Sequence, residues 1–163
     1  MSTAPGYSKT QIWLHWLVVL LIIPQFLLHD SVARTFWGQV KGQSVTPDFL
    51  TYGHIVLGVA ILLLAAWRLV LRATHGTPEP PHDDPELMRF GAKAIHALLY
   101  LTLFALPISG GVAYFLTLGW MAELHSALTT ALLIFAGLHI AAALYHQYVL
   151  KDHLLRRMMK AGG

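Results

Sequence analysis

The chain has 163 residues, of which 56% are hydrophobic and only 12% are charged, and its mean hydropathy is +0.57. Soluble domains carry about 25% charged residues, so this composition indicates a chain that lies mostly within a bilayer. The lack of cysteine excludes disulfides, thiolate metal sites and covalent c-type haem. Basic residues beside membrane spans account for the net charge of +3, and nothing in the sequence indicates nucleic-acid binding.

Four apolar segments of membrane-spanning length follow one another along the sequence, at residues 10–29, 49–71, 94–118 and 124–150. Each approaches or exceeds the roughly 20 residues that a helix needs to cross a bilayer. The alternating pattern of membrane β-strands, in segments of about ten residues, does not occur. The sequence therefore predicts an all-α, integral membrane four-helix bundle that forms one domain over residues 1–163.

The distribution of basic residues predicts the orientation of these spans. Arg34 and Lys41 fall on one side, and the other nine fall on the opposite side: Lys9, Arg68, Arg72, Arg89, Lys93, Lys151, Arg156, Arg157 and Lys160. Loops rich in lysine and arginine stay in the cytoplasm. Both termini are therefore expected to be cytoplasmic.

Every predicted span carries at least one histidine, and the orientation gives each a depth. Two lie near the periplasmic ends of spans two and four, namely His54 and His125. Four lie toward the cytoplasmic side: His15, His96, His139 and His146. A lone intramembrane histidine is explained equally well by an interhelical hydrogen bond. Histidines on all four spans, matched in depth, favour cofactor ligation.

The spacing of two of these histidines suggests haem as the cofactor. His125 and His139 are separated by about 21 Å along a helix and by only about 40° of rotation, which suits two cofactors stacked across the membrane. Neutral imidazole supplies both axial ligands of an electron-transfer haem, so two haems need four histidines. His54 and His125 are expected to form the periplasmic pair, because they lie at the same depth. His15 matches His139 on the cytoplasmic side, but depth alone leaves two competitors there, His96 and His146.

Residues around these histidines are compatible with haem. Gly58 and Gly137 would leave room for a porphyrin, although small residues also favour helix packing in lipid. Arg68 is a candidate partner for haem propionates, whereas Arg72 is explained as well by anchoring at the membrane surface. The remaining histidines are expected in or near loops, exposed to solvent: His29, His75, His82 and His153.

Four stretches of the chain, in order, resemble the bacterial cytochrome b561 family. They are "HWLVVLL" from His15, "YGHIVLGVAILLLAAWRLVLR" around His54, "HALLYLTLFALPISG" from His96, and "GLHIAAALYHQYVLKDHLLRRMM" around His139. The fourth stretch is the most specific, and the similarity spans nearly the whole chain. Within the family, the chain is most similar to four-helix, di-haem members that oxidise superoxide.

The resemblance implies a multi-pass protein of the bacterial inner membrane with two b haems. It pairs His15 with His139 at the cytoplasmic haem and His54 with His125 at the periplasmic haem. It leaves His96 and His146 near the cytoplasmic haem, where ubiquinone would bind. The implied reaction oxidises superoxide to dioxygen on the periplasmic side and reduces ubiquinone, with two superoxides consumed per quinone. No catalytic residue for superoxide is identified from the sequence.

A second interpretation is an electron-transfer subunit that links the quinone pool to a periplasmic redox protein. A basic funnel of Arg34 and Lys41 over the periplasmic haem would favour the superoxide enzyme, because superoxide is an anion. An exposed apolar patch there would favour a protein partner. The connection between spans three and four, "TLGWMAEL", is short. A haem-free transporter is disfavoured because the spans lack embedded Asp, Glu or Lys residues for an ion path.

Overall fold

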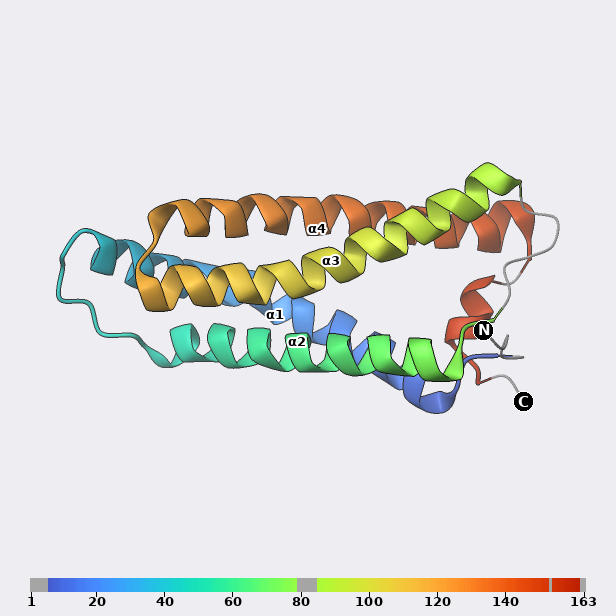
Figure 1. Ribbon diagram of the computed structural model, residues 1–163, viewed down its shortest axis with the longest axis horizontal. Coiled ribbons are helices and arrows are strands. Elements are labelled where there is room, and N and C mark those ends of the chain that lie inside the picture. Colours follow the sequence, from blue (N-terminus) through green and yellow to red (C-terminus); the bar gives the residue numbers. More distant parts are fainter. Residues whose placement is uncertain (1–5, 79–84, 153, 162–163) are drawn as a thin grey trace.

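The computed structural model describes residues 6–78, 85–152 and 154–161, and it shows four long helices that run back and forth along one axis (Figure 1). They are α1 (Lys9–Val40), α2 (Phe49–His75), α3 (Glu86–Leu116) and α4 (Gly119–Tyr145). A π-helical segment, η1 (His146–Leu150), continues α4, and a short 3₁₀ helix, η2 (Leu154–Met158), follows it. All four long helices are long and apolar enough to cross a membrane. The predicted all-α four-helix membrane bundle is confirmed.

Two helices extend well beyond the predicted spans. α1 continues to Val40 rather than ending near residue 29, and α3 begins at Glu86 rather than near residue 94. The polar extension of α1 stays helical because it is bonded to the start of α2: Thr35 Oγ1 lies 3.1 Å from Thr51 Oγ1. The apolar pattern marks only the lipid-facing part of each helix, so it underestimates the helices that continue past it.

Local signals set the helix ends. Ser8 caps α1 in a reciprocal capping box, in which Ser8 Oγ accepts from Gln11 N and the Gln11 side chain accepts from Ser8 N. Gln11 Nε2 also donates to the Gly76 carbonyl at 3.1 Å, which joins the start of α1 to the end of α2. The tight connection after α3 requires a left-handed residue, Thr117, with φ of 54°.

The helices form two antiparallel hairpins, because α1 packs chiefly against α2 and α3 against α4. Both hairpins turn at the same end of the bundle, through residues 41–48 and 117–118, and we call this end the hairpin side (Figure 1). The start of α1, the end of α2, the start of α3 and the helix η2 lie at the opposite end, which we call the termini side. Packing between the hairpins is sparser, which leaves space for a cofactor between them.

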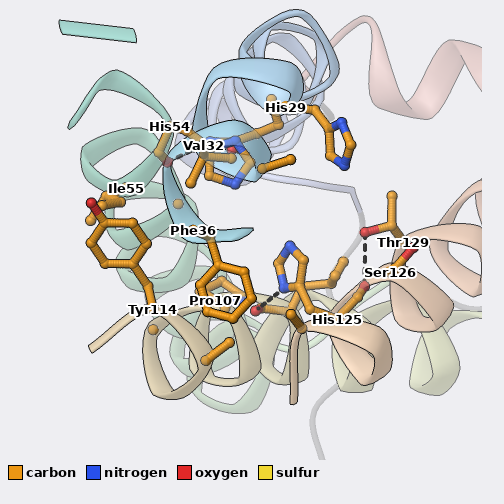
Figure 2. Close-up of a pocket in the computed structure, with 18 of the residues that line it drawn as sticks. His29, Val32, Phe36, His54, Ile55, Pro107, Tyr114, His125, Ser126 and Thr129 are labelled. Atoms are coloured by element: carbon orange, nitrogen blue, oxygen red, sulfur yellow. Dashed lines mark hydrogen bonds between the residues drawn. The ribbon is translucent and has the colours of Figure 1, made fainter. Parts of the chain in front are cut away.

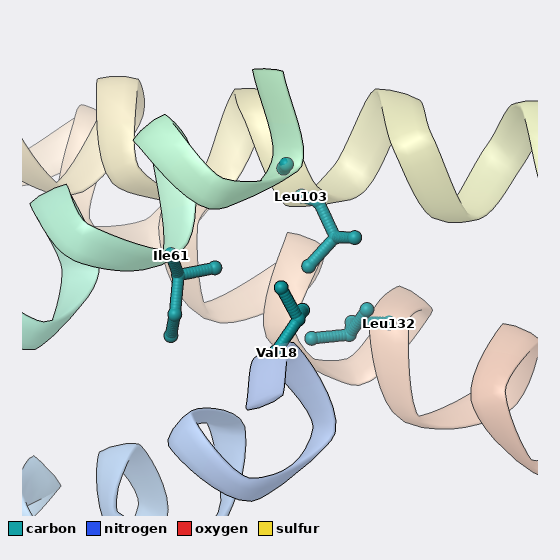
Figure 3. Close-up of a cluster of buried hydrophobic side chains, with 5 residues drawn as sticks. Val18, Ile61, Leu103 and Leu132 are labelled. Carbon is teal, nitrogen blue, oxygen red and sulfur yellow. The ribbon is translucent and has the colours of Figure 1, made fainter. Parts of the chain in front are cut away.

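The buried core is a thin apolar layer halfway along the bundle (Figure 3). All four helices contribute to it: Val18, Ile61, Ala65, Leu103 and Leu132. Most other large apolar side chains are exposed, for example Leu27 at 79% and Leu63 at 65%. An apolar surface of this kind is stable in lipid and not in water, which agrees with a membrane-embedded bundle.

Candidate functional site

Histidines from the two hairpins face each other at two levels. On the hairpin side, the rings of His54 from α2 and His125 from α4 have centroids 6.3 Å apart and planes at 64°. On the termini side, the rings of His15 from α1 and His139 from α4 have centroids 6.3 Å apart and planes at 67°. Leu132 of the buried layer lies midway between His125 and His139 on α4. The bundle therefore holds two nearly identical imidazole pairs, separated by a layer of apolar side chains.

The spacing of both pairs fits one metal ion between two imidazoles. An imidazole nitrogen binds a first-row metal such as zinc at about 2.0–2.1 Å, and a ring with bonds of about 1.33 Å places this nitrogen about 1.1 Å from the centroid. Two imidazoles on opposite sides of one metal would thus have centroids about 6.3 Å apart. This is the distance in both pairs, so the residues fit a bis-histidine haem at each level.

A cavity of about 490 Å³ opens between the hairpins at the hairpin-side pair. Figure 2 shows His54 and His125 on opposite walls, with both rings directed into the space between them. Gly58 and Gly111 also line the cavity, and a Cβ added to either glycine would meet no atom within 4 Å. The glycines thus leave open room, as expected of a cavity that receives a planar cofactor.

His125 is held in one orientation by α3. Its Nδ1 lies 2.9 Å from the Leu106 carbonyl, which can only accept, so Nδ1 carries the proton. Gly110 lies against the same ring, and a Cβ there would come within 2.9 Å of His125 Cε1. The hydrogen bond leaves Nε2 as the free lone pair, in the arrangement that second-shell carbonyls give to metal-binding histidines.

The partners of the α4 histidines carry unsatisfied nitrogens. Nδ1 of His15 and Nδ1 of His54 are buried, and each has no hydrogen-bond partner among the described residues. Buried polar atoms are nearly always paired in folded proteins. Neither ring is therefore held at Nδ1 by a hydrogen bond within the described part of the chain, and both rings are free to interact with a group from outside it.

A third histidine lies on the termini side but does not fit as a ligand in the same way. The ring of His96 is 5.0 Å from that of His139, too close for a metal between the two centroids. Its Nδ1 donates to the Ala92 carbonyl at 2.6 Å. Of the competitors for His139, the geometry therefore favours His15 and places His96 beside the pair.

The termini side also concentrates positive charge. Arg68 lies with its guanidinium 5.9 Å from the Tyr100 ring centroid, and it is within electrostatic reach of Tyr7 and Arg72. No carboxylate among the described residues forms an ion pair with Arg68. Tyr7 precedes the spans, and burial raises the pKa of its hydroxyl. Arg68 also shares a side-chain hydrogen bond with Tyr100, and its guanidinium could in addition pair with an anion such as a haem propionate.

The remaining predicted site residue, His146, has a separate partner. Its Nδ1 lies 2.5 Å from Asp152 Oδ2, and the two side chains are only 12% and 18% exposed. Asp152 could not be identified from the sequence, because its contact with His146 depends on an unusual turn at the end of α4. The structure therefore separates His146 from the His15–His139 pair.

His29 is exposed, as expected, but its expected place in or near a loop was wrong. His29 lies within α1 rather than in a loop, and it lines the cavity beside His54 and His125 (Figure 2). A signal was present, since His29 follows His15 at the same 14-residue spacing that separates His125 from His139. His75 ends α2 and is exposed as expected. His82 and His153 lie outside the described residues.

The basic funnel considered from the sequence does not form around Arg34. Arg34 Nη2 lies 3.2 Å from Asp48 Oδ2. Asp48 also accepts hydrogen bonds from Ser31 Oγ and from Thr51 N and Oγ1. These bonds lower the pKa of Asp48 to about 2, and the bond from Ser31 has the largest effect. The described residues that line the cavity include Glu123 but no lysine or arginine. The charge of Arg34 is therefore balanced locally.

Comparison with known proteins identifies the family. The family model described as prokaryotic cytochrome b561 matches residues 6–161. A cytochrome b562 of Cereibacter sphaeroides is 34% identical over 98% of this chain and 99% of its own. A probable superoxide oxidase, CybB, of Yersinia pestis is 32% identical over 94% of this chain and 95% of its own. A cytochrome b561 homolog 1 of Escherichia coli is 26% identical over 94% of this chain and 96% of its own.

The four membrane-spanning helices, the facing histidines and the match over nearly the full length agree with one another. The chain belongs to the prokaryotic cytochrome b561 family, whose members are membrane proteins that bind b-type haem and transfer electrons.

Proposed function

We propose that the protein is a di-haem cytochrome b, with His54 and His125 as ligands of one haem and His15 and His139 as ligands of the other. The observation that carries this proposal is the recurrence of one spacing, 6.3 Å between ring centroids, at two levels of the bundle. When bound, haem b supplies reversible one-electron chemistry, and two imidazole ligands suit it to electron transfer. The chain supplies the ligands, their separation and a dry layer between them.

The orientation follows from the basic residues. Nine of the eleven lysines and arginines lie toward the termini side. We therefore assign the termini side to the cytoplasm and the hairpin side to the periplasm of a bacterial inner membrane. Electrons would then enter near His54 and His125 and leave near His15 and His139.

Superoxide is the proposed electron donor. One relative that matches nearly the whole chain is named a probable superoxide oxidase, and a cavity lies beside His54 and His125. Oxidation of two superoxide anions yields two dioxygen molecules and two electrons and releases no proton. The donor site therefore needs no acid or base, which agrees with its mainly apolar lining.

Ubiquinone is the proposed acceptor, on the termini side. Its reduction takes up two electrons and two protons, so a titratable group near the exit is required. His96 and His146 lie on this side, and an imidazole can both donate and accept a proton. Arg68 would stabilise the cofactor on this side by pairing with its propionates.

A second candidate function is favoured by one specific observation. Arg34 is paired with Asp48, and the described lining of the cavity contains Glu123 without any lysine or arginine. Such a surface attracts superoxide weakly. A periplasmic redox protein that docks on the hairpin side would need no basic funnel, and the chain would then act as an electron-transfer subunit.

Rapid anaerobic mixing of the oxidised, haem-loaded protein with superoxide distinguishes these functions. The superoxide enzyme predicts fast haem reduction with release of dioxygen, and consumption of ubiquinone when it is added. Haems that remain oxidised with superoxide but are reduced by ubiquinol would contradict this function and support the electron-transfer subunit.

A further inference from the structure

The end of α4 departs from regular helical geometry at His146. Residues His146–Leu150 form a π-helical turn, and Lys151 then adopts a left-handed conformation with φ of 57°. Positive φ is uncommon for a lysine, and π-helical turns occur frequently at functional sites. The amides of Lys151 and Asp152 both donate back to the His146 carbonyl. The chain therefore reverses its direction around His146.

This reversal brings the Asp152 carboxylate onto the His146 ring. Oδ2 contacts His146 Nδ1, while Oδ1 accepts from Leu154 N at 3.0 Å and caps η2. Burial raises the pKa of Asp152, but the hydrogen bonds from His146 and Leu154 outweigh burial and keep the pKa below its usual value. An ionised carboxylate only accepts hydrogen bonds. His146 must therefore carry its proton on Nδ1, which leaves Nε2 as the exchangeable position.

A second histidine–aspartate pair differs from this one in burial and in sequence separation. His29 and Asp30 are adjacent in sequence, their side chains are 60% and 104% exposed, and the contact is 3.2 Å. An exposed pair of this kind contributes little to orientation. His146 and Asp152 are six residues apart, mostly buried, and brought together only by the π-helical turn.

The folded-back segment is also fixed to the rest of the bundle beside the termini-side histidines. Trp16 Nε1 donates to the Met158 carbonyl at 2.8 Å, and the Trp16 ring lies against His15 at 5.2 Å between centroids. His146 follows His139 by one heptad, which places it about 10 Å farther along the same face of α4. His146 therefore lies between the His15–His139 pair and the aqueous surface.

We propose that Asp152 is a positioning residue, which holds His146 with Nδ1–H toward its carboxylate and presents Nε2 to the electron acceptor on the termini side. The inference rests on the proposed function, in which that acceptor is ubiquinone. The Nε2–H bond of the imidazolium breaks and its proton moves to the reduced quinone oxygen. Asp152 stays ionised and stabilises the imidazolium, and solvent then restores the proton at Nε2. Each quinone that accepts two electrons requires two such deliveries.

The test compares Asp152→Asn with the unmodified, haem-loaded protein. Asparagine keeps an oxygen that can cap η2 but lacks the charge that stabilises the imidazolium. We expect kcat for ubiquinone reduction to fall about 10- to 100-fold, the range for loss of a second-shell carboxylate, with KM and both haem spectra unchanged. Asp152→Glu should restore part of kcat. Asp30→Asn, which removes the carboxylate of the exposed pair, is the matched control and should leave kcat unchanged.

Nitrogen-15 NMR of the imidazole rings in the reduced protein gives a readout that does not depend on turnover. His146→Gln assigns the His146 signals. The unmodified protein should show the Nδ1–H tautomer of His146, and Asp152→Ala should lose this preference. An unchanged tautomer, or an unchanged kcat in Asp152→Asn, overturns the positioning role while the proposed function stands. An unmodified protein that takes up electrons but reduces no ubiquinone refutes the acceptor, and the inference falls with it.

Discussion

The two histidine pairs have the same spacing but very different surroundings. The hairpin-side pair, His54 and His125, opens into a mainly apolar cavity whose described lining holds no lysine or arginine. The termini-side pair, His15 and His139, lies within reach of Arg68 and beside a third histidine, His96. The two pairs thus differ in positive charge: among the described residues, the hairpin-side cavity is lined by no lysine or arginine, whereas the termini-side pair lies near Arg68.

This asymmetry indicates a division of labour within one family scaffold. Equal spacing is required because both pairs would hold the same cofactor. The difference in surroundings agrees with the proposed function, in which electron uptake from superoxide would need no proton, whereas reduction of a quinone would need two. Positive charge near Arg68 also stabilises an added electron, so the termini-side haem is expected to have the higher potential and to receive electrons from the other haem.

The largest expected effect is the loss of one haem at a time. His125→Ala or His54→Ala should remove the hairpin-side haem and lower the haem-to-protein ratio from two to one, because a single imidazole remains at that level. His15→Ala should remove the other haem instead. The pyridine haemochrome assay measures the ratio, with His75→Ala at the exposed end of α2 as the control. Retention of both haems in the first two variants would refute the pairing.

Gly110→Ala should weaken the hairpin-side haem alone. The new Cβ would lie 2.9 Å from His125 Cε1. Such overpacking costs about 1–3 kcal/mol, which is equivalent to a roughly 5- to 150-fold lower haem affinity. Haem transfer to apomyoglobin measures this loss. Gly91→Ala on the same helix, where a Cβ meets nothing within 4 Å, is the matched control. Equal haem loss from the two variants would show that Gly110 does not support His125.

Arg68→Gln should lower the midpoint potential of the termini-side haem by on the order of 50 mV, because it removes a positive charge without a carboxylate partner. Arg34→Gln on the hairpin side should have a smaller effect, since Asp48 already balances Arg34. Potentiometric titration followed by absorbance distinguishes the two haems. A larger shift for Arg34→Gln would reverse the proposed asymmetry of charge.

The smallest effect concerns the polar contacts of Asp48 at the hairpin side. The pKa of Asp48 falls from 3.8 to about 2 in the folded chain, so its stabilising effect is complete above about pH 4 and is lost as the pH falls through 2. Asp48→Asn should lower Tm by a few degrees at neutral pH, and the difference from the unmodified protein should shrink on acidification. Circular dichroism in detergent measures both. Asp30→Asn, an exposed carboxylate, should show no such convergence.

The sequence predicts the four helices and the depth of each histidine, because bilayer thickness and helical rise fix both quantities. It cannot choose between His15 and His96 as the partner of His139, since that choice depends on packing that separates 6.3 Å from 5.0 Å. His29 could have been found from its 14-residue spacing after His15. The contact of Asp152 could not, because it depends on a π-helical turn that no apolar pattern announces.

The balance of Arg34 by Asp48 illustrates a further limit of sequence-based reasoning. The two residues are 14 positions apart, and they meet only because α1 continues for two more turns beyond Arg34 and the chain then returns to α2. Counts of basic residues on one face therefore overestimate the charge available to an anion. Whether basic residues form a funnel for an anion depends on which of them are paired with carboxylates in the folded chain.

The central claim, that two equally spaced histidine pairs hold two haems in one chain, is tested most directly by haem stoichiometry combined with low-temperature electron paramagnetic resonance of the unmodified, oxidised protein. The account predicts two haem b per chain, both low-spin and both with two imidazole ligands. A single haem, or a high-spin signal from one of the two sites, would contradict it.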